Sequence, residues 1–538
     1  MKQIKILYSA VVICFLGLIA RLYIVMIQNG AVLKGMAENQ QNYKIELNGG
    51  RGNIYDKNLL SFTAVGKKRV VVVVRSNNEV KDLELLQRIS KEKAGNYFKQ
   101  LKKDGIVYVD VHWDFNEHEL AEHPNACVLE DAKRYADSGE GAVTLGYLQD
   151  GEGVCGIEFA CNTYLNAGDG YTVNVCKDAF GKMLPGLSFT KEKTSGKLLK
   201  TTLNKKYMRI CQDALEDKVG AAVLLDVETF DVVAMVSSPT FNPNSVEEYL
   251  DEQNYPFLNR ATAMYDMGSI FKIVVLAAAL ENKSVKKEDV FACNGGKMVG
   301  NVSFSCKNHP AFEKMTVEQA FLHSCNAVFI DIGQKTEYNS IIDMAMSFGL
   351  GENLIHPIDF PQNKGVLPDS DTYYQADLAN LSIGQGKLLG TALHGAVFSA
   401  VIAGGGERKS VNIVDCLLNY DLSEYKSLRN TKSTKVLSPE NAEIIKELMI
   451  KTVQCGTGQN ALSDVVDCGG KTGSAQTGIL MDGKECVHGW FTGFFPAEQP
   501  KYALCVFVEN GRSGAQSAAP VFKNIQEKIA YAEGWVDR

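Results

Sequence analysis

The sequence predicts an α+β protein in three parts: an N-terminal transmembrane helix, an elongated mixed domain, and a larger domain in which helices flank an antiparallel sheet. Three observations support this. An almost wholly apolar run opens the chain, a run of five valines and charged helical stretches follow, and strand-like runs lie at both ends of the remaining sequence with helical stretches between them. We place the parts at residues 1–28, 29–200 and 201–538.

Length and composition agree with several folded units. A chain of 538 residues is too long for one ordinary hydrophobic core. Apolar residues make up 45% and charged residues 22%, which is typical of globular proteins. The net charge is -7 and no extended basic stretch is present, so nucleic acid is not expected as a partner.

The first part is the apolar run Ile6–Ile27, whose length suits a membrane-spanning helix of about 20 residues. Its exception, Arg21, lies near the far end, where a long side chain reaches the interface. Lys2 and Lys5 precede the run, so the positive-inside rule places the N-terminus in the cytoplasm and everything after Gln28 outside. Because no small-residue cleavage site follows, we favour a single-pass anchor over a cleaved signal peptide.

The second part has no recognisable catalytic pairing. Val70–Val74 predicts a buried strand, Val80–Lys103 has helical character, and Leu145–Gly170 is rich in Gly, Asp and Glu, as in loops. We expect a non-catalytic, dimerisation-like domain that acts as a pedestal and holds the third part away from the membrane.

The third part begins with a predicted hairpin, Ala221–Leu225 and Val232–Ser237, and ends with the strand-like runs Gly470–Gly473, Gly489–Phe495 and Tyr502–Glu509. Strands so close in sequence favour an antiparallel sheet. The predicted helices are Lys205–Lys218, Ser269–Asn282, Thr316–Lys335, Thr391–Ala403, Pro439–Thr452 and Pro520–Ala532.

The first chemical motif is Ser269-Ile-Phe-Lys272, at the start of a predicted helix. Lys272 follows Ser269 by one turn, so both side chains share a face. A buried lysine with a lowered pKa can accept the serine proton. The S-x-x-K pattern occurs four more times, but in polar stretches that are typical of solvated surface, whereas the apolar residues after Lys272 predict burial.

Two further motifs follow in a fixed order. Ser324-Cys325-Asn326 lies within a predicted helix or loop, and Lys471-Thr472-Gly473 lies in a predicted strand before Ser474. A strand edge with Lys and Thr can bind a carboxylate, and glycine lets another backbone come close. Alone, each motif also fits a helix cap or a surface charge; the ordered set of three favours one site.

The set S-x-x-K, S-x-N and K-T-G resembles that of class B penicillin-binding proteins, which are monofunctional peptidoglycan D,D-transpeptidases. The resemblance extends along nearly the whole chain. Further matching segments are Arg51–Asp56, Gly146-Tyr147, Gly153–Glu158, Ala234–Pro239, Asn259-Arg260, Gly268–Lys272, Ile383–Gly386 and Gly456–Gly458.

The resemblance implies a transpeptidase domain of the serine β-lactamase type. Ser269 would be the acylated nucleophile, Lys272 its base and Ser324 a proton relay, while Asn326 would hydrogen-bond Lys272 and the substrate. Lys471, with Thr472 and Gly473, would bind the terminal carboxylate of the substrate, and the N–H groups of Ser269 and Ser474 would form the oxyanion hole.

The implied reaction joins peptidoglycan stem peptides in cell wall biogenesis, with release of D-alanine and inhibition by β-lactams. The implied partner is a membrane glycan polymerase, in cell division or cell shape. Two alternatives stay open: a D,D-carboxypeptidase or β-lactamase-like hydrolase, and a non-enzymatic β-lactam sensor or scaffold.

We expect no cofactor and no metal. The chain has 14 cysteines, of which 13 lie outside the apolar run, and an odd number cannot pair fully within one chain, so most are expected to be small buried hydrophobic residues. Neither of two groups that contain histidine has standard ligand spacing: His112, His118 and His123, and Cys293, Cys306 and His309.

Overall fold

The computed structural model describes residues 2–30, 42–47, 51–76, 78–91, 93–112, 115–149, 151–166, 170–176, 188–192, 197–215, 217–306, 309–369, 373–481 and 484–536. The chain forms two compact units. The first comprises Met1–Arg51, Gly66–Lys133 and Ala167–Ser195, and the second comprises Gly52–Val65, Arg134–Asn166 and Gly196–Arg538. The second unit thus includes two segments that precede residue 201 in sequence.

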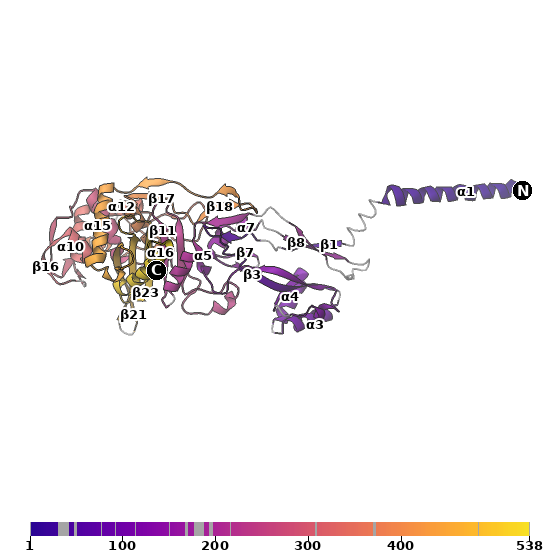
Figure 1. Ribbon diagram of the computed structural model, residues 1–538, viewed down its shortest axis with the longest axis horizontal. Coiled ribbons are helices and arrows are strands. Elements are labelled where there is room, and N and C mark those ends of the chain that lie inside the picture. Colours follow the sequence, from indigo (N-terminus) through magenta and orange to yellow (C-terminus); the bar gives the residue numbers. More distant parts are fainter. Residues whose placement is uncertain are drawn as a thin grey trace. The chain divides into compact units, whose positions relative to one another are not determined.

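The first unit begins with helix α1 (Lys2–Tyr23), which continues as a short π-helix, η1 (Ile24–Gln28) (Figure 1). Within the described residues, one helix is long and apolar enough to cross a membrane, and it covers Ile6–Ile27. None of its apolar window is buried against the rest of the protein. The structure therefore contains a candidate membrane span where the sequence predicts one.

A small α/β layer forms the core of the first unit. Strand β3 (Gly66–Val74) pairs antiparallel with β4 (Ile106–Val111) and β5 (Ala126–Lys133), and helices α3 (Glu79–Ile89) and α4 (Ala94–Asp104) complete the layer. Val71 and Val73 of β3 pack with leucines of both helices, and all five valines of the run are buried. A second sheet has the order β1 (Asn42–Leu47), β8 (Gly170–Cys176), β9 (Ser188–Glu192).

The second unit is built on a five-stranded sheet in the order β12-β11-β23-β22-β21, with every pair antiparallel. The strands are β11 (Gly220–Asp226), β12 (Val232–Ser238), β21 (Gly469–Met481), β22 (Lys484–Phe495) and β23 (Tyr502–Gly511). The hairpin and the three later strands predicted from sequence are therefore all present. β21, which carries the K-T-G motif, lies at one edge of this sheet.

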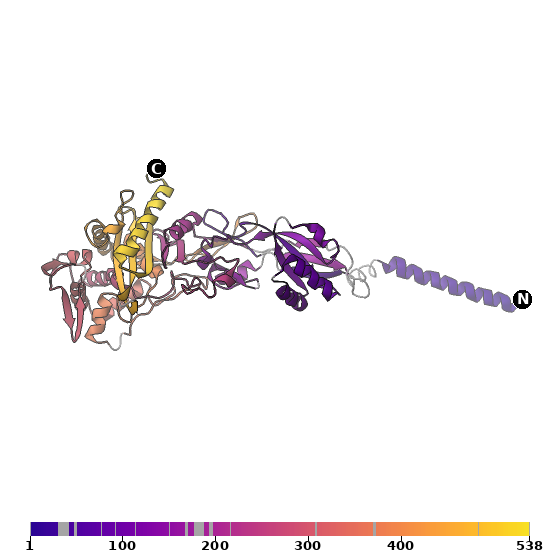
Figure 2. The same cartoon turned by 90° about the horizontal axis from the view of Figure 1, so that it is seen from below.

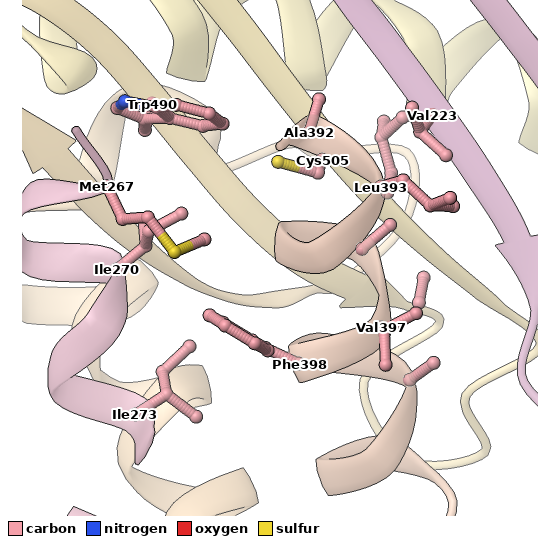
Figure 3. Close-up of a cluster of buried hydrophobic side chains, with 14 of the residues drawn as sticks. Val223, Met267, Ile270, Ile273, Ala392, Leu393, Val397, Phe398, Trp490 and Cys505 are labelled. Atoms are coloured by element: carbon pink, nitrogen blue, oxygen red, sulfur yellow. The ribbon is translucent and has the colours of Figure 1, made fainter. Parts of the chain in front are cut away.

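Helices cover both faces of the sheet. On one face, Leu393 and Phe398 of α14 (Ala392–Ala403) pack near Cys505 of β23 (Figure 3). On the other face lie α8 (Lys205–Ala214) and α16 (Ala519–Glu533), which runs beside the sheet strands (Figure 2). Side chains of a strand alternate between faces, so Tyr502 points to α8, where its ring centre lies 5.9 Å from that of Tyr207.

One predicted helix is wrong. Residues Thr316–Lys335 form two helices, α10 (Val317–Leu322) and α11 (Asn326–Thr336), instead of one. Between them Ser324 adopts φ 54°, a left-handed conformation that an α-helix cannot contain. The Cys325 side chain then caps α11 by accepting a hydrogen bond from the backbone N–H of Val328.

The other predicted helices of this unit are found, although Ser269 itself lies in a 3₁₀ turn, η4 (Gly268–Phe271), before α9 (Lys272–Glu281). The remaining elements are β2 (Ile54–Tyr55), η2 (Glu117–Leu120), α5 (Ala142–Leu145), β6 (Leu148–Gln149), β7 (Glu152–Gly153), α6 (Gly156–Ala160), α7 (Asn162–Leu165), β10 (Leu198–Thr201), η3 (Val246–Tyr249), β13 (Val290–Cys293), β14 (Gly296–Val299), β15 (Val302–Ser305), β16 (Phe312–Thr316), α12 (Tyr338–Ser347), α13 (Gln375–Ser382), β17 (Glu407–Lys409), β18 (Val414–Leu418), β19 (Glu424–Ser427), β20 (Ser433–Lys435), α15 (Pro439–Cys455), η5 (Gln459–Ala461) and η6 (Gly514–Ala518).

Candidate active site

Ser269 lies on a turn that is held from two sides. The preceding Gly268 has φ 56°, and its N–H donates to the carbonyl of Gly384 at 2.8 Å. The indole N–H of Trp490 donates to the carbonyl of Asp266 at 3.0 Å. A Cβ at Gly384 would lie 2.0 Å from the Gly268 carbonyl oxygen, so glycine is required for this close approach. The half-buried Ser269 is thereby fixed in η4, directly before α9.

Lys272 is fully buried one turn after Ser269. Its Nζ donates to the carbonyl of Ser324 at 2.8 Å and to Asn326 Oδ1 at 2.8 Å, and it lies 3.3 Å from Ser324 Oγ. Burial lowers the pKa of Lys272 to about 7, because a charged ammonium is disfavoured away from water. Near neutral pH, a large fraction of this side chain is therefore a neutral amine that can accept a proton.

Ser324 and Asn326 reach Lys272 because the chain breaks between α10 and α11. The positive φ of Ser324 directs both its carbonyl and its hydroxyl toward Lys272. Asn326 is also fixed from its other end, since its Nδ2 donates to the carbonyl of Ser305 at 3.0 Å. The left-handed backbone of Ser324 costs about 1–3 kcal/mol and is maintained by the surrounding structure, as is common at functional sites.

Lys471 of β21 is the second buried lysine of the site. Its Nζ donates to the carbonyl of Thr472 at 3.1 Å and lies 5.7 Å from the centre of the Phe321 ring. Burial, and the nearby charge of Lys272, hold the pKa of Lys471 well below its usual range. An anion bound beside Lys471 would reverse this effect, because an opposite charge favours the ammonium form.

Thr472 has a partner that the sequence did not single out as a site residue. Its Oγ1 lies 2.8 Å from Oγ1 of Thr457, whose N–H donates to the carbonyl of Leu322 at 3.1 Å. Thr457 follows the last turn of α15, in the segment Gly456–Gly458. The sequence signal for Thr457 was its place in Gly456–Gly458, a segment that resembles the family. The structure shows why Gly456 is needed there, because a Cβ at Gly456 would lie 2.6 Å from the Leu322 carbonyl oxygen.

Gly473 and Ser474 bring the edge strand against the Ser269 turn. A Cβ at Gly473 would lie 3.0 Å from Ile270 Cγ2 and 3.1 Å from the carbonyl oxygen of Met267. Ser474 Oγ accepts a hydrogen bond from the N–H of Gly514 at 3.0 Å. The backbone of β21 therefore runs directly beside η4, the turn that carries Ser269.

The three motifs thus come together from three elements. A nucleophilic hydroxyl, a buried amine beside an amide and a second hydroxyl, and a buried cation on a strand edge are the groups that acyl transfer through a serine ester requires. All eight residues predicted from sequence for this site lie within this region: Ser269, Lys272, Ser324, Asn326, Lys471, Thr472, Gly473 and Ser474.

A group of three cysteines and one histidine lies next to this site. Cys293, Cys306, His309 and Cys325 have ligand atoms that all lie within 4.8 Å of one another. In contrast, among the described residues His112 and His118 are exposed and His123 is buried, and they form no comparable group.

Comparison with known proteins gives one consistent result. A model of the penicillin binding protein transpeptidase domain matches residues 220–527. The peptidoglycan D,D-transpeptidase PbpA of Mycobacterium tuberculosis is 29% identical over 385 residues, which cover 66% of this chain and 76% of that protein. Stage V sporulation protein D of Bacillus subtilis is 26% identical over 546 residues, which cover 96% of this chain and 83% of that protein.

The likeness extends to three dimensions. The structure of penicillin binding protein 3 from Mycobacterium tuberculosis, complexed with aztreonam, superposes with a TM-score of 0.66 at 22% identity and covers 91% of this chain and 97% of that one. The transpeptidase-domain fold is therefore shared.

Proposed function

The chain belongs to the penicillin-binding protein transpeptidase family, and from this we propose that it is a class B peptidoglycan D,D-transpeptidase that cross-links stem peptides through an acyl-enzyme on Ser269. The relative PbpA is named for this activity, and the structure of a further relative holds a β-lactam. β-Lactams are accordingly the expected inhibitors of this chain.

In the first step of the proposed reaction, the neutral amine of Lys272 takes the proton of Ser269 as Oγ attacks the carbonyl of a D-Ala-D-Ala amide. The N–H groups of Ser269 and Ser474 receive the developing oxyanion. Ser324 passes a proton from Lys272 to the leaving amine, and D-alanine departs. In the second step an amine of a neighbouring stem peptide attacks the ester and regenerates Ser269.

Substrate position in this proposal depends on the strand edge. The terminal carboxylate of the donor peptide binds Lys471 and Thr472, and its charge stabilises the Lys471 ammonium that burial otherwise disfavours. Gly473 keeps the strand free of a side chain beside the peptide. Asn326 holds Lys272 and contacts the substrate amide.

One observation supports this mechanism above the others. Lys272 is fully buried, has a pKa of about 7, and is oriented by oxygen atoms of Ser324 and Asn326 that lie within 3.3 Å of its Nζ. A lysine in this state matches the requirement for a base that works near neutral pH. A structural ion pair would instead place a carboxylate beside the ammonium.

The test is covalent labelling of the full-length protein with fluorescent penicillin. Wild type should label and retain the label, whereas Ser269→Ala should not label although it folds. Ser423→Ala is the matched control, because Ser423 precedes Lys426 in an exposed S-x-x-K copy. Equal labelling of wild type and Ser269→Ala would refute the assignment, and rapid loss of the label would favour a hydrolase.

We further propose that residues 29–200 act as a non-catalytic pedestal, that the catalytic domain lies outside the cell membrane with the N-terminus in the cytoplasm, and that a membrane glycan polymerase is the partner. The exposed Cys455 offers a test of orientation. A membrane-impermeant maleimide should modify it in intact cells in wild type but not in Cys455→Ser. Modification only after lysis would contradict the proposed orientation.

A further inference from the structure

Four possible metal ligands from residues 293–325 gather at the start of α11. Cys293 ends β13, Cys306 follows β15, His309 lies three residues later, and Cys325 caps α11. Their sequence spacing does not resemble a standard zinc motif, which is why the sequence predicts no metal. Only the folded chain brings Cys325 to the other three.

The distances between sulfurs fit a shared metal ion. Cys306 Sγ lies 3.7 Å from Cys293 Sγ and 3.7 Å from Cys325 Sγ. A tetrahedral zinc ion with Zn–S bonds of about 2.3 Å holds its sulfurs about 3.8 Å apart. A disulfide requires about 2.05 Å, and it would use only two of the three thiols. One central ion accounts for all three at once.

His309 supplies an independent indication. Its Nε2 is buried and has no hydrogen-bond partner among the described residues, which exclude 307 and 308. Its Nδ1 lies 2.6 Å from the carbonyl oxygen of Pro310, so Nδ1 carries the proton and leaves the lone pair on Nε2. Histidines that bind metals commonly make this second hydrogen bond to a carbonyl, which fixes the ring. A buried Nε2 without a partner points to a missing ligand.

The surroundings favour thiolates, which are the form that binds metal. The backbone N–H of Ala327 donates to Cys306 Sγ at 3.4 Å, and that of Val328 donates to Cys325 Sγ at 3.5 Å. Both N–H groups belong to the first turn of α11, whose positive dipole end stabilises negative charge. Cys293 and Cys325 are fully buried, so water does not compete with the metal there.

We propose that Cys293, Cys306, His309 and Cys325 form a structural zinc site of the Cys₃His type. Three thiols lose their protons on binding, and the four ligands complete a tetrahedral coordination shell without an open position. The site is structural, because Ser269 and the substrate groups lie outside the coordination shell.

The site has a consequence for the proposed transpeptidase reaction and in that respect rests on it. Cys325 lies between Ser324 and Asn326, which both contact Lys272. Asn326 also contacts the carbonyl of Ser305, the neighbour of Cys306. A metal ion would therefore fix the S-x-N segment on both sides and hold Ser324 in its left-handed conformation. Ser324 and Asn326 are positioned by the metal, which takes no part in the acyl transfer itself.

The test begins with metal content. Full-length protein, purified in detergent without chelators and equilibrated with Zn²⁺, should contain about one zinc ion per chain when measured by inductively coupled plasma mass spectrometry. Cys306→Ser should lose most of it, whereas Cys455→Ser, an exposed cysteine on α15, should retain it. Absence of zinc in wild type, equal zinc in Cys306→Ser, or a disulfide among the three thiols in the protein as first purified would overturn the site.

A second pair of variants guards against simple misfolding of Cys306→Ser. His309→Cys keeps a four-ligand set and should bind zinc, whereas His309→Ala should bind it weakly. Co²⁺ in wild type should give the visible absorption of a tetrahedral thiolate complex. Equal zinc retention in His309→Ala and His309→Cys, or a Co²⁺ spectrum without thiolate bands, would contradict the assignment.

Acylation separates this inference from the proposed function. Removal of zinc by a chelator should slow acylation by penicillin by at least about tenfold, and reloading should restore it, because displacement of a catalytic group by about 1 Å has effects of this size. Bound zinc with no acylation at all would refute the proposed function and leave the metal site intact. Full acylation by a metal-free wild type would refute the positioning role alone.

Discussion

Gly384 provides the sharpest test of how the Ser269 turn is held. Gly384 has φ 75°, and a Cβ there would lie 2.0 Å from the carbonyl oxygen of Gly268. Ordinary contact distances are about 3.5 Å or more, so Gly384→Ala requires the two backbones to separate by more than about 1 Å. The hydrogen bond from Gly268 N–H to the Gly384 carbonyl would be strained as well.

A matched variant in the same loop separates the two contributions to the destabilisation, the left-handed backbone and the steric clash. Gly386 also has a left-handed φ, 88°, but its nearest neighbour is the Asn380 side chain at 3.1 Å. Both alanine variants therefore incur the backbone cost of about 1–2 kcal/mol. Gly384→Ala adds an overpacking cost of about 1–3 kcal/mol and displaces Ser269. We expect acylation by penicillin to fall about 10²-fold in Gly384→Ala and only slightly in Gly386→Ala.

The assay is the second-order rate constant of acylation by fluorescent penicillin, with thermal unfolding of both variants measured alongside. The comparison isolates the clash, because the two substitutions are chemically identical. If Gly384→Ala acylates as fast as Gly386→Ala, Gly384 does not hold the Ser269 turn and the argument fails.

Three further outcomes are expected. Acylation should rise as pH increases through about 7, because below its lowered pKa Lys272 is protonated and cannot accept a proton; a profile that is flat from pH 5 to 9 would contradict this. Thr457→Val removes the hydroxyl partner of Thr472 and should lower binding of a peptide substrate with a free carboxylate, read as a higher KM, while unfolding is little changed; an unchanged KM would exclude this role. Glu509→Gln weakens the ion pair between the buried Arg260 and the half-buried Glu509, whose carboxylate oxygen lies 3.0 Å from Arg260 Nε, and should reduce the free energy of unfolding by about 3 kcal/mol in denaturant titration; a loss near zero would contradict the stabilising role of this pair.

Periodicity and apolar runs predicted the parts of the fold that depend on local sequence. The strands β11, β12 and β23 are each built on a long apolar run that is buried, and polar residues occur only at their ends. The run of five valines in β3 identified the central strand of the first unit in the same way. The interleaving of segments 52–65 and 134–166 with the second unit depends on long-range contacts, which no local pattern records.

The break at Ser324 shows where local reasoning fails. The residues on both sides of it form helices, and no proline or glycine marks the interruption. The left-handed φ of Ser324 is maintained by tertiary contacts, among them the hydrogen bonds from Lys272. Sequence placed Ser324 and Asn326 in the site by motif but not by conformation. It also singled out Cys293, Cys306 and His309 but not Cys325, because only the folded chain brings Cys325 to the other three.

The S-x-x-K pattern occurs five times in this chain, so the motif by itself does not create a catalytic base. Lys426 of one copy is exposed, whereas Lys272 is fully buried. Burial alone would leave a lysine neutral but undirected. The acceptors from Ser324 and Asn326 aim the Lys272 amine, and the packing of Gly384 and Gly473 against the turn places Ser269 beside the edge strand. The reactivity that we propose for Ser269 therefore depends on the fold around the motif. For this reason we expect substitutions at these glycines to impair acylation, although neither glycine has a side chain to take part in it.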